Sequence, residues 1–114
     1  MFKLSFAKPV GGASFAELPR GAQLRFNEAF ELLEERPRTP GPGLDIHQLS
    51  GYQNLWTLSI PPWRGIYALD GDQVVMIVFG HRENIYPKLH GLLAPEGRYV
   101  AGASLGPRRG RAGA

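Results

Sequence analysis

The sequence predicts an α+β fold, in which a single antiparallel-rich sheet of about four to five strands carries an N-terminal helical hairpin packed on one face. Two observations lead to this prediction. Apolar residues recur with helical spacing over 20–36, and several short alternating or apolar segments separated by turn residues fill 44–79. The chain has 114 residues, which is enough for one domain and too few for two.

The N-terminal third supplies the first strand and the hairpin. Residues 2–7 alternate apolar and polar side chains, as a strand does. The next segment, 8–18, holds a possible helical turn, but Gly11 and Gly12 weaken any helix there. The helix over 20–36 is the clearest element, and a proline ends it. Its apolar face consists of Ala22, Phe26, Ala29, Phe30 and Leu33.

The middle of the chain reads as a meander of strands that follows a Pro/Gly-rich loop at 36–43. The segment 73–79 is almost continuously apolar, which is typical of a strand buried on both faces. Asp70-Gly71, just before it, is a strong signal for a tight hairpin turn. We therefore expect four strands here, at 44–49, 55–60, 63–69 and 73–79, and then a turn or one short helix over 81–90.

The positive charge lies in the last part of the chain. The formal net charge is +3, and residues 91–114 hold four arginines against one glutamate. The rest of the chain is formally neutral, so a globally basic nucleic-acid-binding face is not predicted. We expect a folded domain over 1–90 and a flexible, basic, Gly/Ala-rich tail over 91–114.

Composition also excludes several kinds of site. The chain has no cysteine, so disulfides and thiolate metal sites are absent. The three histidines show no metal-ligand spacing, and we expect neither metal nor cofactor. No apolar run approaches the roughly 18 residues of a membrane span, and the N-terminus does not resemble a signal peptide. We expect a cytoplasmic protein without a membrane partner.

Four polar residues bracket the last predicted hairpin: Arg64, His81, Arg82 and Tyr86. Strands joined by a tight turn run antiparallel, so the start of one lies beside the end of the next. The two arginines are therefore predicted to be neighbours. A planar guanidinium binds two phosphate oxygens, and a histidine titrates nearest neutrality and suits acid–base work. The structural alternatives are arginine–carboxylate pairs, a histidine that caps the strand end, and a tyrosine packed on the sheet.

These residues form part of a longer pattern. It runs from Leu49 and Gly51 through the strand Trp63-Arg64-Gly65-Ile66-Tyr67, the Asp70-Gly71 turn and the apolar strand 74–79 to Gly80-His81-Arg82 and Tyr86. In this combination the chain resembles the RelE/ParE superfamily of toxins from type II toxin–antitoxin systems, some of which serve plasmid stabilization. The resemblance covers roughly residues 2–90, and the downstream tyrosine favours the RelE branch.

The resemblance implies a RelE-like mRNA interferase, that is, a metal-free endoribonuclease that cuts mRNA in the ribosomal A site and so inhibits translation. The implied catalytic residues are Arg64, Arg82, Tyr86 and His81. The implied partners are a cognate antitoxin protein, the ribosome and mRNA, with DNA reached only through the antitoxin. Two alternatives stay open: a ParE-like, non-enzymatic inhibitor of DNA gyrase, and a degenerate member that retains only antitoxin binding.

One feature departs from the RelE pattern. The third strand of these toxins usually carries lysines or arginines for proton transfer or phosphate binding, whereas Thr57 and Ser59 occupy the matching positions here. No lysine or arginine lies between Arg38 and Arg64. Three alternatives follow: His81 takes over the acid–base role, the activity is weak, or the fold serves a different target.

Overall fold

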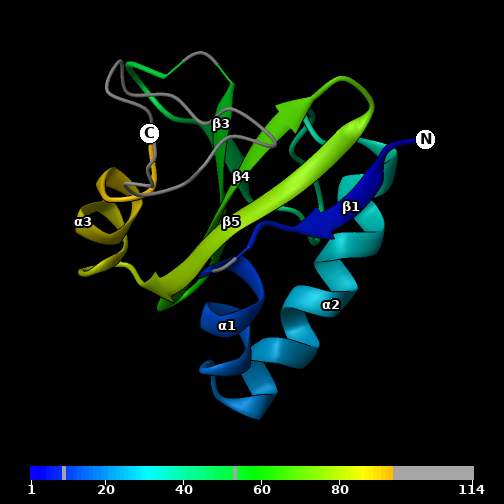
Figure 1. Cartoon of the computed structure of the whole chain (residues 1–114). Helices are drawn as coiled ribbons and strands as arrows, with labels where there is room; N and C mark the ends of the chain where they lie inside the picture. The colour runs from blue at the N-terminus through cyan, green and yellow to red at the C-terminus, as the bar shows by residue number, and fades with distance from the viewer. Residues whose placement is uncertain (9, 53, 94–114) are drawn as a thin grey trace.

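The computed structural model describes residues 1–8, 10–52 and 54–93. They form one five-stranded sheet with the strand order β1-β5-β4-β3-β2 and three helices (Figure 1). All neighbouring strands are antiparallel except β1 and β5, which are parallel. The predicted fold class is confirmed. The elements are β1 (Lys3–Phe6), α1 (Val10–Ala16), α2 (Arg20–Glu35), β2 (Ile46–Gln48), β3 (Leu55–Ile60), β4 (Trp63–Asp70), β5 (Gln73–His81) and α3 (Ile85–His90).

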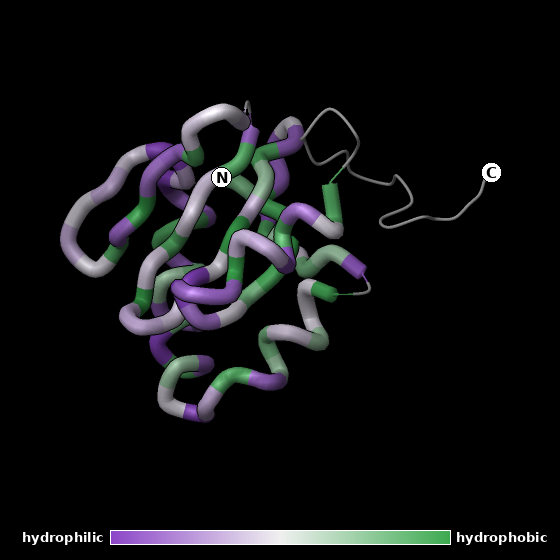
Figure 2. Tube along the Cα trace, turned by 90° about the vertical axis from the view of Figure 1, so that its left-hand side faces the viewer, coloured by the Kyte–Doolittle hydropathy of each residue, from purple (hydrophilic) through white to green (hydrophobic). Residues whose placement is uncertain are grey.

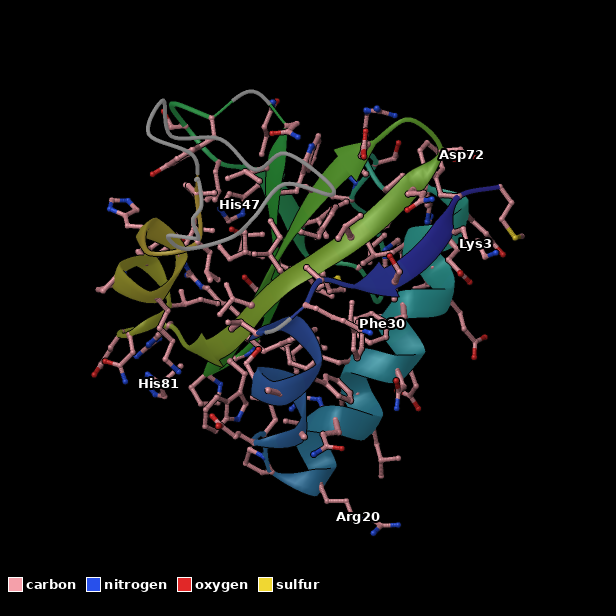
Figure 3. All side chains as sticks on the ribbon, in the orientation of Figure 1. Lys3, Arg20, Phe30, His47, Asp72 and His81 are labelled. Carbon is pink, nitrogen blue, oxygen red and sulfur yellow. The ribbon has the colours of Figure 1, made fainter. Side chains whose placement is uncertain are left out.

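The α1–α2 hairpin covers one face of the sheet through a cluster of phenylalanines. Phe26 and Phe30 on α2 point toward the strands, because the predicted apolar face of this helix is the buried one. The ring of Phe79 on β5 lies 5.2 Å from that of Phe26 and 5.1 Å from that of Phe15, both edge-on. Edge-to-face pairs of this kind add to the burial energy of the rings. Figure 3 shows Phe30 between helix and sheet.

The first helix forms in spite of its two glycines, and one of them, Gly11, allows the helix to pack closely on the sheet. A Cβ added to Gly11 would lie 2.4 Å from the carbonyl oxygen of Met76, so α1 packs directly on the backbone of β5. Ser14, one turn later, is buried, and its Oγ accepts a hydrogen bond of 3.0 Å from the Phe79 N–H. The glycine that weakens the helix in isolation thus permits its close contact with β5.

Strand β5 is an interior strand of the sheet, between β1 and β4. Residues 74–80 are all buried, as the apolar run predicts. Over the molecule as a whole, apolar segments of the trace lie inside and polar segments dominate the outer turns (Figure 2). The β4–β5 register shifts between two consecutive pairs, Ile66 with Val78 and Tyr67 with Met76. Ile77 is therefore an extra residue, and this β-bulge reverses the side-chain alternation beyond it.

The opposite face of the sheet is covered at one end by α3. Ile85 and Leu89 on α3 are fully buried against Ile66, Ile77 and Val78. At the end of α3, His90 Nε2 and Tyr52 Oη form a hydrogen bond of 2.8 Å. These contacts fix α3 beside the ends of β4 and β5.

The loop after α2 is held by a buried tyrosine of the sheet. The hydroxyl of Tyr67 donates a 2.8 Å hydrogen bond to the carbonyl oxygen of Pro37. Burial raises the pKa of Tyr67 far above that of a free tyrosine, and the positive charge of Arg38 only partly opposes this shift.

The predicted boundary at residue 90 falls close to the end of the described chain. Leu92 and Leu93 are half-buried against the α3 side of the sheet, and the predicted tail from 94 onward lies outside the described residues. No helix within the described ranges is long and apolar enough to cross a bilayer.

Candidate functional site

Arg64 and Tyr86 meet at the end of the β4–β5 hairpin. Arg64 is the second residue of β4, with Ser59 on one side and Gly80 on the other. Its Nη1 donates a hydrogen bond of 2.8 Å to the hydroxyl oxygen of Tyr86, near the start of α3. Both side chains are half-buried. The buried apolar face of α3 thus places the phenol beside the guanidinium.

Arg82 lies next to this pair, directly after β5. Its backbone N–H donates a 3.0 Å hydrogen bond to the carbonyl oxygen of Pro62, which ties it to the two-residue turn between β3 and β4. Its side chain is exposed. Arg64 and Arg82 line one small pocket of about 110 Å³, together with Asp45, Ser59, Pro61, Pro62 and Trp63.

The two guanidinium groups of this pocket are not neutralised by carboxylates within the described chain. The Tyr86 phenol is the hydrogen-bond partner of the Arg64 guanidinium, and no described carboxylate forms an ion pair with Arg64 or Arg82. Asp45 contributes the one carboxylate among the described residues that line the pocket. The arrangement suits an anion that binds two guanidinium groups at once, such as a phosphodiester.

His81 lies on the other side of the sheet. The bulge at Ile77 places Phe79 and His81 on the face of the α1–α2 hairpin, and the imidazole stands edge-on to Trp63 with 5.5 Å between ring centroids. Its Nδ1 accepts a 3.2 Å hydrogen bond from the Glu83 N–H, so the proton of the neutral ring is on Nε2. Figure 3 shows His81 at the end of β5. The structure therefore brings Arg64, Arg82 and Tyr86 together and separates His81 from them.

His81 lines a different pocket of about 390 Å³, to which α1 and α3 also contribute. Trp63 is the residue that lines both this pocket and the arginine pocket. Sequence reasoning grouped all four residues because a regular hairpin would place them at one end of the sheet. It missed the bulge, because an apolar run contains no signal for one extra residue.

The two positions where basic residues were expected differ in environment. Thr57 is fully buried, and its Oγ1 has no hydrogen-bond partner among the described residues. Ser59, two residues further along β3, is half-buried and lines the arginine pocket. A lysine at 57 would bury its charge, whereas a lysine at 59 would extend the basic site.

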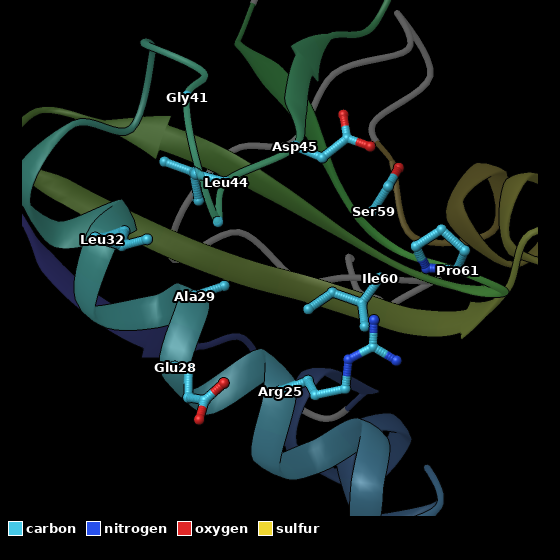
Figure 4. A pocket seen from close by; sticks show the side chains of 11 residues that line it. Arg25, Glu28, Ala29, Leu32, Gly41, Leu44, Asp45, Ser59, Ile60 and Pro61 are labelled. Carbon is cyan, nitrogen blue, oxygen red and sulfur yellow. The ribbon is translucent and has the colours of Figure 1, made fainter.

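A larger pocket of about 530 Å³ adjoins the arginine site and contains none of the four predicted residues. Arg25 of α2 reaches toward Ile60 and Pro61 at the end of β3 (Figure 4), and Glu28 and Ser59 also line this pocket. Asp45 lines both this pocket and the arginine pocket. Sequence reasoning missed Asp45, because its place beside Ser59 depends on the pairing of β2 with β3.

The described residues offer no evident metal site, since no group of three or more His, Asp or Glu side chains lies close enough to hold an ion. His47 on β2 is exposed.

Comparison with known proteins gives the fold. No protein-family model matches the chain, and no curated protein sequence matches it. Solved structures do match. The toxin–antitoxin complex RelB–RelE from Methanococcus jannaschii has a chain with a TM-score of 0.60 and 22% identity, covering 71% of this chain and 93% of its own. The archaeal RelE–RelB complex from Pyrococcus horikoshii has a chain with a TM-score of 0.58 and 24% identity, covering 71% of this chain and 94% of its own.

A mutant toxin from Helicobacter pylori is also similar, with a TM-score of 0.61 and 19% identity over 75% of this chain and 99% of its own. At these identities the likeness establishes the architecture rather than the activity. The chain has the fold of the RelE toxins.

Proposed function

We propose that this chain is the toxin of a type II toxin–antitoxin system and cleaves mRNA on the ribosome in a metal-free reaction. The observation that supports this most directly is the 2.8 Å hydrogen bond from Arg64 to Tyr86, with Arg82 lining the same pocket. The RelE fold around this pocket supports the same proposal.

The proposed reaction begins with the scissile phosphodiester in the arginine pocket. The ribose 2′-hydroxyl attacks the phosphorus, which forms a new P–O bond and expels the 5′-oxygen of the next nucleotide. Arg64 and Arg82 stabilise the extra negative charge that the phosphate carries in the transition state. Fixed cations at the site of developing charge are usually the largest contribution to catalysis of this kind.

Proton transfer needs a base for the 2′-hydroxyl and an acid for the leaving oxygen. The Tyr86 oxygen accepts the hydrogen bond from Arg64, so its own proton is free to be donated to the 5′-oxygen. Asp45 is the acceptor of protons that lines this pocket, and its carboxylate takes the proton of the 2′-hydroxyl. His81 has no direct part in this reaction, because it lines a separate pocket.

The proposed partner is a cognate antitoxin protein. Two of the structural neighbours are complexes of a RelE chain with its RelB antitoxin, which supports this partner for a chain of the same fold. Co-purification of this chain with the product of an adjacent small reading frame tests it.

The nuclease is tested in a cell-free translation reaction with mapping of mRNA 5′ ends by primer extension, with and without ribosomes. We expect cuts within codons that require ribosomes and disappear with Arg82→Ala. The matched control is Arg20→Ala, since Arg20 is also exposed but lies at the far end of α2 (Figure 3). Both variants must retain the circular dichroism spectrum of the wild type.

Other outcomes separate the alternatives. Intact mRNA together with loss of DNA supercoiling by gyrase would favour the ParE-like inhibitor. Intact mRNA, normal gyrase activity and retained antitoxin binding would leave a protein that keeps only the partner interface.

A further inference from the structure

The pocket that contains His81 has no role in the proposed cleavage. It is larger than the arginine pocket, about 390 Å³ against 110 Å³, and it opens between α1, α3 and the ends of β4 and β5. Trp63 separates it from the arginine pocket and lines both. Two sites that share one wall are positioned to bind adjacent groups of a single ligand.

Resting on the proposed function, we propose that this pocket binds an unpaired nucleobase of the RNA, next to the phosphate held by Arg64 and Arg82. A nucleotide joins an anionic phosphate to a planar base, and the two neighbouring pockets offer a cationic site and an aromatic site in that order. The indole of Trp63 is the aromatic surface. Stacking of bases on aromatic side chains is a general means of holding single strands.

The rest of the pocket supplies polar groups that suit the edge of a base. The Nε2–H of His81 is a donor, because Nδ1 is already occupied by the Glu83 N–H. The Glu17 carboxylate is an acceptor, and the Asn84 side chain offers both functions. An apolar protein side chain would leave these groups without partners, which favours a nucleobase as the ligand.

Lys88 adds a positive charge where the pocket meets α3. A Cβ built on Gly80 would lie 3.4 Å from Lys88 Nζ, so the ammonium lies over the end of β5. The same lysine lines the pocket of His81. Because Gly80 is the register partner of Arg64, Lys88 extends the positive charge of the arginine site to the boundary between the two pockets, which suits an RNA backbone that crosses the strand ends.

This placement gives His81 a role in binding rather than in proton transfer. A β-bulge carries it to the hairpin face, where the nucleotide next to the cleaved bond is read. Consecutive residues of the motif Gly80-His81-Arg82 thus line different pockets. Arg82 contacts the phosphate and His81 contacts the neighbouring base.

The test measures binding of short RNAs to the full chain by NMR titration of ¹⁵N-labelled protein. The probe is a trinucleotide with 2′-O-methyl groups, which prevent cleavage. It is compared with the same RNA lacking a base on the 5′ side or on the 3′ side of the central phosphate. We expect wild-type affinity to fall at least about fivefold when the base on one of these sides is missing.

Variants localise that preference. Trp63→Leu and His81→Ala should each reduce the ratio of affinities for the complete and the abasic RNA. Arg64→Ala should weaken binding of both RNAs by the same factor. His47→Ala is the matched control, since His47 is exposed on β2 and lines neither pocket, and it should leave the ratio unchanged.

Two results would overturn the inference in different ways. Equal affinity of the wild type for complete and abasic RNAs, or an unchanged ratio in both pocket variants, would leave phosphate binding intact and remove the base pocket. Failure of the wild type to bind either RNA at millimolar concentration would contradict the proposed RNA-binding function itself, and the base pocket with it.

Discussion

The two adjacent glycines of α1 should respond in opposite directions to the same substitution. Both lie in the first turn of the helix, and both weaken it by sequence criteria. At Gly12 an added Cβ meets Phe6 Cδ2 at 3.7 Å, an ordinary contact. At Gly11 it meets the Met76 carbonyl oxygen at 2.4 Å, which the backbone must relieve by moving.

The expected magnitudes follow from these distances. Gly12→Ala gains helix propensity of up to about 1 kcal/mol. Gly11→Ala gains no more than that, and it must move α1 from β5 by about 1 Å. This shift costs about 1–3 kcal/mol for overpacking and about 1–3 kcal/mol for the buried Phe79 N–H that loses Ser14 Oγ. Subtracting the helix-propensity gain of up to about 1 kcal/mol from these two costs leaves a net destabilisation of about 1–6 kcal/mol for Gly11→Ala.

Urea unfolding followed by circular dichroism measures both free energies. The two variants should move the midpoint in opposite directions without a change of slope. Equal effects, or a stable Gly11→Ala protein, would refute the close packing of α1 on β5. Ser14→Ala is a useful third variant, because it removes the hydrogen bond and leaves the backbone contact unchanged.

Three further predictions concern the core and the site. Thr57→Val should raise the free energy of unfolding by about 1 kcal/mol, because it removes a buried hydroxyl without a partner among the described residues; a destabilised variant would contradict this. The wild type should lose stability above about pH 10, since the unfolded state releases the Tyr67 proton there while the buried phenol, whose pKa is raised, retains it. Between pH 8 and pH 11 the free energy of unfolding should fall less for Tyr67→Phe than for the wild type, and equal falls would exclude Tyr67 as the cause. Tyr86→Phe should lower the rate of ribosome-dependent cleavage about 100-fold or more if the phenol is the acid, with unfolding little changed, and single-turnover cleavage assays give this rate; a normal rate would remove that role.

The helical and strand periodicities were sufficient to predict the layers of this fold. The apolar face of α2 and the apolar run of β5 both specify burial directly, and both are buried as predicted. The parallel pairing of β1 with β5 could not be predicted in this way, because alternation in 2–7 indicates a strand but not its neighbour. For a related reason the two glycines of α1 led to the prediction of a weak helix. The requirement for Gly11 depends on the backbone carbonyl of Met76, about 65 residues away in sequence.

The candidate site was predictable where it depends on a hairpin and unpredictable where it depends on irregular structure. The proximity of Arg64 and Arg82 follows from antiparallel pairing across a tight turn. The position of His81 depends on one extra residue, Ile77, inside a uniformly apolar strand. The nearness of Asp45 depends on the register of a three-residue edge strand, which the sequence specifies only weakly.

The order of strands in the sheet also determines when the protein can fold during synthesis. Strand β1 is the first to be made, and its register partner begins at Gln73, far along the chain. Strand β5 is the neighbour of both β1 and β4, so β1 and α1 have no native sheet to bind until β5 has been translated. Contacts between such distant segments slow folding. The arginine site is therefore completed only after α3, which carries Tyr86, has been translated, and a nascent chain that has not reached α3 has no assembled site.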